Sequence, residues 1–236
     1  MEFWNGKKKA ITFSFDDGVT QDKRLVKILN KYGLKSTFNI NSSLLGLDGE
    51  LNFDGQIVSH NKINPLEVKR LYEGHEVAVH TLTHPNLTTL RGETVAWQIE
   101  EDRKILESLV GYPIVSMAYP CGGVNNDDRV AQIISDQTKI KLARTVTSTY
   151  NFNLQDNLYR FNPTIHFAYV DKLFELGRQF LQLEPSTPKL FYIFGHSYEL
   201  DMDLINWEQF EEFCAMISQK DDIFYGTNKE TLLCDM

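Results

Sequence analysis

Two neighbouring carboxylates occur near the start of the chain, in the stretch FSFDDGV. An Asp-Gly pair is typical of a tight hairpin turn, because both residue types tolerate a positive φ. The following residues favour another interpretation, since apolar side chains recur near helical spacing over residues 19–32 and Gly33 is a typical C-cap. The pattern predicts a strand, a tight turn and a helix, with Asp16 and Asp17 directly after the strand.

Two histidines, His80 and His84, stand four residues apart in the stretch HTLTHPN. On a helix this spacing lets two imidazoles share a metal ion. On a continued strand it would separate them by about 13 Å, too far for bonds of about 2.1 Å to one ion. Pro85 disfavours helical geometry at His84. We therefore expect the strand to stop at His80 and the chain to curl through residues 81–83, which brings both rings inward.

Two imidazoles and one carboxylate suit a catalytic divalent metal, in either a zinc-type hydrolase or a non-haem iron oxygenase. A metal hydrolase needs a general base beside the attacking water, whereas an oxygenase needs no second carboxylate there. Adjacent residues in a turn can point to different sides, so one of Asp16 and Asp17 can bind metal while the other faces the water. The hydrolase interpretation therefore accounts for more residues.

Short apolar runs alternate with longer helical patterns along the chain. The predicted strands cover residues 10–15, 36–40, 76–80, 115–120, 140–145 and 189–196. The predicted helices after the first cover residues 65–73, 93–110, 126–138, 168–183 and 206–219. This alternation predicts an α/β fold with a parallel sheet, open or closed into a barrel. Two Asp-Gly pairs predict a hairpin-like insertion around residues 43–62, over one rim of the sheet.

Active sites of such folds lie at the carboxyl ends of the parallel strands. Chemically reactive residues follow four of the predicted strands: Asp16 and Asp17, His80, Tyr119 with Cys121, and His196. We therefore expect these side chains to meet at one rim.

Composition restricts the functions that are compatible with the chain. Its 236 residues carry no linker or low-complexity run, which predicts a single domain over residues 1–236. A net charge of −8 without a basic patch argues against nucleic acid and anionic membranes as partners. No apolar run approaches the length of a membrane span or a signal peptide, and the three cysteines have no zinc or disulfide spacing. We expect a cytoplasmic protein; nothing in the sequence indicates its oligomeric state.

Four stretches, TFSFDDG, GHEVAVHTLTHPNL, AYPCGG and IFGHSYEL, occur in an order and spacing that resemble the polysaccharide deacetylase family. This family has the NodB homology domain and is also called carbohydrate esterase family 4. The resemblance covers about residues 8–225. It implies an irregular (β/α) barrel with about seven parallel strands, and metal-dependent removal of acetyl groups from an N- or O-acetylated carbohydrate.

The resemblance also implies a role for each matching residue. Asp17, His80 and His84 correspond to the ligands of one divalent metal ion, zinc first, with cobalt, nickel, manganese or iron as alternatives. Asp16 corresponds to the general base and His196 to the general acid.

The sequence departs from the family pattern beside the fourth strand. The family has an Arg two residues before the Pro of AYPCGG and an aromatic residue after it, where this chain has Ala118 and Cys121. Our hypothesis is that Arg144, from the next strand, supplies the missing guanidinium. We further expect the Cys121 N–H to bind the oxyanion, and Tyr119 to contact the substrate.

Two alternatives remain open. One is a metal-dependent amidohydrolase acting on a small non-peptide C–N bond, and the other is a degenerate carbohydrate-binding protein. Among the remaining histidines, His75 is interpreted as structural, and no role is assigned to His60 and His166 because neither has a partner at a suitable spacing.

Overall fold

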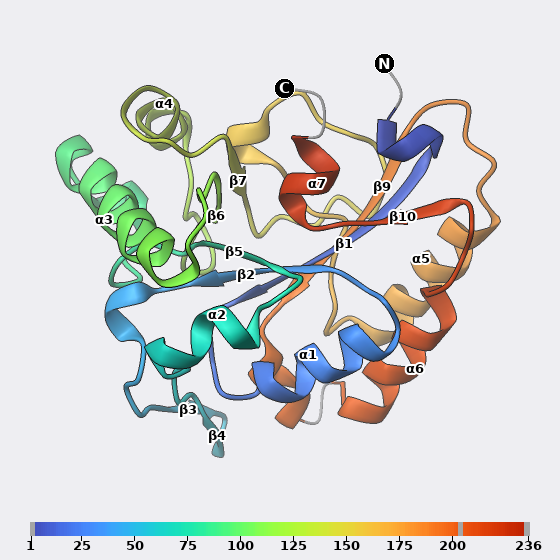
Figure 1. The fold of residues 1–236 in the computed structure, drawn as a ribbon, viewed down its shortest axis with the longest axis horizontal. Helices are drawn as coiled ribbons and strands as arrows, with labels where there is room; N and C mark the ends of the chain where they lie inside the picture. The colour runs from blue at the N-terminus through green and yellow to red at the C-terminus, as the bar shows by residue number, and fades with distance from the viewer. Residues whose placement is uncertain (1–2, 203–204, 234–236) are drawn as a thin grey trace.

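The structure of the protein, a computed structural model, describes residues 3–202 and 205–233 (Figure 1). The strands are β1 (Lys9–Asp16), β2 (Ser36–Ile40), β3 (Glu50–Phe53), β4 (Gln56–Ser59), β5 (Glu76–Val79), β6 (Ser116–Ala118), β7 (Leu142–Arg144), β8 (Ile165–His166), β9 (Lys189–Gly195) and β10 (Ile223–Tyr225). The α-helices are α1 (Asp22–Lys31), α2 (Val68–Leu71), α3 (Gly92–Val110), α4 (Asp128–Gln137), α5 (Val170–Gln182), α6 (Trp207–Ile217) and α7 (Asn228–Leu232). Short 3-10 helices are η1 (Phe3–Gly6), η2 (Ser42–Leu44), η3 (Pro65–Glu67), η4 (Leu87–Thr89), η5 (Leu158–Arg160) and η6 (Ser197–Asp201).

The main sheet has the strand order β7-β6-β5-β2-β1-β9-β8, with β10 also pairing with β1. Every pair in it is parallel. Phe161 forms an isolated parallel bridge with Arg144 of β7, so the chain from Phe161 to β8 connects the two ends of the sheet. Helices α1 and α3 to α6 lie around the outside of the strands (Figure 1). The predicted α/β fold, an irregular barrel with about seven parallel strands, is confirmed.

Residues of β1 alternate between two buried faces: Ile11, Phe13 and Phe15 belong to the apolar core, whereas Thr12 and Ser14 are polar and buried on the other face. All eight residues of β1 are buried, and the rings of Phe13 and Phe15 both pack edge-on against Phe210 of α6. Helix α1 buries one stripe, with Leu25 and Leu29 fully covered. The core therefore fills the space between the barrel and its helices.

Most predicted elements lie within three residues of those in the structure, and β2 has the predicted bounds 36–40. The predicted helix 65–73 is instead η3 followed by α2, and the Asn64 side chain accepts a hydrogen bond from the Leu66 N–H at 2.9 Å. The sequence analysis missed β8, β10 and α7, because two to five residues are too few to show a period.

The predicted hairpin insertion consists of β3 and β4, which pair with each other as a separate two-stranded sheet. Val58 of β4 packs with Val19 and Tyr198 in a small buried cluster beside the main core. The hairpin therefore packs against the loop after β1.

At the opposite end of the barrel, α7 packs against β1 and covers a buried polar network. Glu76, the first residue of β5, accepts hydrogen bonds from the hydroxyls of Thr37 and Ser116 and from the Lys229 N–H. Asn228 of α7 hydrogen-bonds to Ser14 inside the barrel. The amino ends of the strands are thus covered by α7, which contributes hydrogen bonds to Glu76 and Ser14.

Two smaller expectations concern membranes and thiols. Among the described residues, no helix is both long enough and apolar enough to cross a bilayer. Cys121 and Cys214 are free thiols, and Cys234 lies outside the described residues.

Candidate active site

The turn after β1 directs two adjacent carboxylates to different neighbours. Asp16 ends β1, and Asp17 has a φ of +80°, a conformation that is strained for a residue with a side chain. Gly18 follows with a φ of +61°, and a Cβ there would lie only 2.7 Å from Cγ2 of Ile40. The Asp17 N–H donates to the Asn39 carbonyl at 2.9 Å, which fixes the turn to β2. Only glycine fits after the acid pair, as the sequence DDG provides.

The predicted curl after β5 is confirmed. The strand ends at Val79, and Thr81 and His84 have φ values of 66° and 60°. The Asn41 side chain donates to the carbonyls of His80 and Thr81, which holds the turn against β2. As a result, the ring centroids of His80 and His84 are 4.9 Å apart.

Asp17, His80 and His84 form a cluster that can hold a metal ion. Oδ1 of Asp17 lies 3.5 Å from Nε2 of His84 and 3.7 Å from Nε2 of His80. The candidate ligand atoms of all three residues lie within 4.8 Å of one another. Donors about 2.1 Å from a shared ion at tetrahedral angles stand about 3.4 Å apart. The separations therefore fit one divalent cation.

The protonation state of the His80 imidazole suits a metal ligand. Its Nδ1 lies 3.0 Å from the Ala118 carbonyl, which can only accept, so Nδ1 carries the proton and Nε2 keeps its lone pair. Burial lowers the pKa of His80 to about 4, so the ring is neutral at neutral pH. Burial also lowers the pKa of His84.

Asp16 is held by a buried arginine. Nη2 of Arg144 lies 2.5 Å from both carboxylate oxygens, and Arg144 is fully buried. The Asn39 amide donates to Oδ1 of Asp16 at 2.8 Å. Burial alone would raise the pKa of Asp16, but Arg144, His80 and His196 outweigh it and lower the pKa. Asp16 is therefore a fixed, ionised carboxylate.

Arg144 lies beside the position where the sequence has Ala118 in place of the family's arginine. In the parallel pair β6 and β7, Ala118 is the register partner of Arg144. The neighbouring strand thus presents an arginine at the level of Ala118, as hypothesised from the sequence.

His196 follows β9 and pairs with a carboxylate that the sequence analysis did not identify. Glu199 accepts from the His196 N–H at 3.0 Å, and its Oε1 lies 3.3 Å from Nδ1 of the same histidine. Nε2 of His166 lies 3.4 Å from that oxygen. Burial would lower the pKa of His196, but Glu199, Asp17 and Asp16 outweigh it and raise the pKa to about 9. His196 is therefore protonated at neutral pH.

One pocket of about 920 Å³ is lined by the acids and histidines described above: Asp16, Asp17, His80, His84, His166, His196 and Glu199. His60, Tyr150 and Tyr169 also line it. Tyr150 and Tyr169 are 47% and 58% exposed. Cys121 also lines the pocket and has a φ of +69°. Among the described residues, its N–H has no hydrogen-bond partner.

Tyr119 also borders the pocket, but its ring is fully buried and its hydroxyl donates to the Tyr159 carbonyl at 2.7 Å. Tyr119 therefore forms part of the wall without presenting a free face.

Three residues of the site were missed from the sequence. His60 Nε2 lies 3.0 Å from Oδ2 of Asp17, and His166 and Glu199 adjoin His196. His60 and His166 reach the site because distant segments fold back onto it, so no spacing in the sequence could reveal them. The capping-box spacing from His196 to Glu199 was the one available signal.

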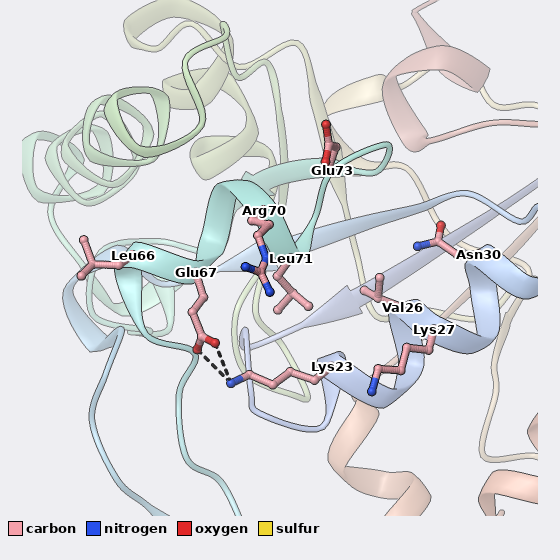
Figure 2. A pocket seen from close by; sticks show the side chains of 9 residues that line it. All are labelled: Lys23, Val26, Lys27, Asn30, Leu66, Glu67, Arg70, Leu71 and Glu73. Atoms are coloured by element: carbon pink, nitrogen blue, oxygen red, sulfur yellow. Dashed lines mark hydrogen bonds and ion pairs between the residues drawn. The ribbon is translucent and has the colours of Figure 1, made fainter.

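Two other features lie apart from the site. His75 accepts from the Ser36 N–H at 3.2 Å and lies beside Asn30, which is consistent with a structural role. Figure 2 shows a second hollow, of about 490 Å³, between α1 and α2. It is lined mainly by exposed charged side chains, and Lys23 pairs with Glu67 across it. It contains no comparable cluster of reactive groups.

Comparisons with curated proteins find several deacetylases. The chain is 27% identical over 124 residues to the peptidoglycan-N-acetylmuramic acid deacetylase PdaC of Bacillus subtilis, which covers 52% of this chain and 23% of PdaC. It is 31% identical over 120 residues to the peptidoglycan-N-acetylglucosamine deacetylase PgdA of Listeria monocytogenes, covering 50% of this chain and 22% of PgdA. The chain thus spans less than a quarter of the length of these relatives.

Solved structures share the fold. The Xyl-CE4 domain of a multidomain xylanase, from the hindgut metagenome of Trinervitermes trinervoides, matches with a TM-score of 0.60 at 17% identity, over 96% of this chain and 91% of that one. A CE4 family pseudoenzyme from Bacillus anthracis matches with a TM-score of 0.55 at 15% identity, over 95% of this chain and 66% of that one. Residues 4–138, more than half of the chain, match the Polysaccharide deacetylase family. The chain therefore belongs to the polysaccharide deacetylase family.

Proposed function

We propose that this protein is a metal-dependent hydrolase that removes acetyl groups from an N- or O-acetylated carbohydrate. The observation that supports this most strongly is the arrangement around the pocket. An ionised carboxylate, Asp16, and a protonated imidazole, His196, face the same space as the cluster of Asp17, His80 and His84. Hydrolysis of an acyl bond needs a base for water and an acid for the leaving group, and both are present.

Asp17, His80 and His84 would hold the cation. When bound, a divalent cation polarises an acyl carbonyl and lowers the pKa of water. Two imidazoles and a carboxylate suit zinc first, and they also accept cobalt, nickel, manganese or iron.

Asp16 is the general base in this proposal. Its carboxylate is ionised, and Arg144 and Asn39 hold it by hydrogen bonds, so it can take the proton of the attacking water without reorienting. Buried cationic support of this kind keeps an acid ionised inside a barrel.

The Cys121 N–H and His196 act on the substrate side. The Cys121 N–H donates to the oxyanion that develops on the acetyl carbonyl. Protonated His196 gives its proton to the departing amine or alkoxide, and Glu199 keeps it protonated up to about pH 9.

The shape of the pocket supports a carbohydrate substrate. Its volume of about 920 Å³ lies at the upper end of ordinary ligand pockets. Tyr150 and Tyr169 offer exposed rings, whose apolar faces can stack on sugar rings. The relatives PdaC and PgdA are named for deacetylating N-acetylated sugars of peptidoglycan, which makes acetylated polysaccharide the substrate class that we propose.

The test is acetate release from a panel of N- and O-acetylated oligosaccharides. We would compare metal-free protein, zinc-reloaded protein and a zinc-reloaded Asp16→Asn variant. Release that needs both zinc and Asp16 is the expected result. If zinc binds stoichiometrically and no sugar loses acetate, the proposal is wrong, and activity on small amides or sugar binding without turnover would separate the two alternatives.

A further inference from the structure

The β3–β4 hairpin brings a histidine to the candidate metal centre from outside the barrel. His60, one residue beyond β4, lies with its Nε2 3.0 Å from Oδ2 of Asp17. Asp17 is 6% exposed, and Nζ of Lys62 lies 3.8 Å from its Oδ1. An ionised carboxylate can only accept, so His60 is the donor in this contact.

The two oxygens of Asp17 therefore face different partners. Oδ1 faces the two imidazoles, at 3.5 Å from His84 and 3.7 Å from His80. Oδ2 faces His60. The hydrogen bond from His60 to Oδ2 fixes the orientation of the carboxylate, and Oδ1 then points toward His80 and His84. Neighbouring hydrogen bonds orient metal-binding carboxylates in this way.

The hairpin holds the backbone of Asp17 as well as its side chain. Lys62 donates from Nζ to the Asp17 carbonyl at 2.9 Å. The Ile63 N–H donates to the Gly18 carbonyl at 2.9 Å, and the Thr20 N–H donates to the Asn61 carbonyl at 2.8 Å. Asp17 has a strained positive φ, which persists only where the surroundings fix it.

The hairpin itself is fixed in place, so it can act as a support. Gln21 donates to the Ser59 carbonyl at 2.8 Å. The ring of Phe53 stacks on Tyr198 with centroids 6.3 Å apart, and Tyr198 lies edge-on to His60 at 5.2 Å. These contacts place His60 between η6 and the loop after β1.

We propose that His60 is a positioning residue of the metal centre, which fixes the Asp17 carboxylate for cation binding and makes the hairpin part of that centre. This inference rests on the proposed metal site. Its readout is metal affinity, which does not require the substrate to be known.

The experiment measures the zinc affinity of the intact chain by competition with a chromophoric chelator. The variants are His60→Ala, His60→Gln and the control Ile57→Ala, an exposed position on the same hairpin. We expect His60→Ala to bind zinc about 10- to 100-fold more weakly, as loss of a carboxylate's supporting hydrogen bond does. Glutamine can donate from a similar position, so His60→Gln should recover most of the affinity, and the control should match the unsubstituted protein. Thermal melting of each metal-free variant checks that it is folded.

Three results would overturn the inference. The first is unchanged zinc affinity in folded His60→Ala, which would leave the proposed metal site intact. The second is equal weakening by His60→Gln and His60→Ala. The third is the loss of one of three cobalt-shifted imidazole N–H proton signals in His60→Ala, which would make His60 itself a ligand. If the unsubstituted protein binds no zinc, the proposed metal site fails together with this inference.

Discussion

The two ends of the barrel each hold a buried acid, and the pKa values of the two acids are shifted in opposite directions. Asp16, at the carboxyl end of β1, has its pKa lowered because Arg144, His80 and His196 outweigh burial. Glu76, at the amino end of β5, has its pKa raised because burial outweighs its hydrogen bonds and the charge of Lys229. Both are nearly inaccessible in the same fold, so burial alone does not make a base. Asp16 stays ionised because of its cationic neighbours, above all Arg144.

The ends also differ in their access to solvent, and the open end carries strained residues beside its pocket. Asp17, Thr81, His84 and Cys121 all have positive φ values, and all lie at the carboxyl end of the strands beside the pocket. Each such residue costs about 1–3 kcal/mol and persists because its neighbours fix it. The amino end is covered by α7, and its hydrogen bonds join neutral groups to one acid. The charged groups therefore concentrate where the chemistry is proposed, and strained residues lie among them.

The largest predicted effect comes from removing the buried cation. Arg144→Met leaves Asp16 ionised and unpaired inside the barrel, which should lower the free energy of unfolding by about 3–5 kcal/mol. Adding Asp16→Asn should recover much of that loss, because the uncompensated charge is gone. Denaturant unfolding of the single and double variants measures both effects. Wild-type stability of Arg144→Met would show that the pair does not set the state of Asp16.

At the closed end, Asn228→Ala should affect stability and leave chemistry unchanged. Asn228 accepts from the Thr12 hydroxyl at 3.0 Å and donates to Ser14 at 3.3 Å, so its loss leaves buried groups unpaired. The free energy of unfolding should fall by about 1–3 kcal/mol. Ser14 also accepts from Asn39, which contacts Asp16. A slower acetate release by the folded variant would therefore mean that the two ends are coupled.

Glu199→Gln should change the pH dependence at the open end. A raised pKa keeps His196 protonated below about pH 9, and activity that needs this proton is lost as the pH rises through that value. Without the charge of Glu199, only Asp17 and Asp16 among the groups facing His196 still raise its pKa. The fall in activity should move down by about one pH unit, which corresponds to about 1.4 kcal/mol. An unchanged pH profile would show that Glu199 does not raise the pKa of His196.

The smallest effect is expected from Glu76→Gln on stability. A raised pKa in the folded state means that the folded protein binds this proton more tightly than the unfolded chain. Stability from Glu76 is therefore present at low pH and is lost as the pH rises through the pKa of the folded state. Relative to the unsubstituted protein, Glu76→Gln should gain melting temperature as the pH rises from 4 to 8. A loss over that range would contradict a raised pKa of Glu76 in the folded protein.

The sequence predicts the residues at the carboxyl ends of the strands better than the distant residues that hold them in place. Strand β2 has the predicted bounds, and the curl from His80 to His84 follows from strand geometry and Pro85. These features depend on neighbouring residues, which a single sequence contains.

The supports depend on contacts between distant segments. His60 reaches Asp17 from 43 positions away, and Arg144 reaches Asp16 from 128 positions away. Arg144 was found only because the family position at Ala118 lacked its arginine. No missing family residue pointed to His60. Strands β8 and β10 and helix α7 are too short to show a period in the sequence.

The most direct test of the central claim compares matched amide substitutions at the two ends of the barrel. Zinc-loaded Asp16→Asn and Glu76→Gln each replace one buried carboxylate without changing its shape. Acetate release from the best sugar of the panel should fall about 10²- to 10⁴-fold in Asp16→Asn, the usual contribution of a general base. It should stay at the wild-type level in Glu76→Gln. Equal activity of the two variants would contradict the account, because Asp16 would then not be the general base.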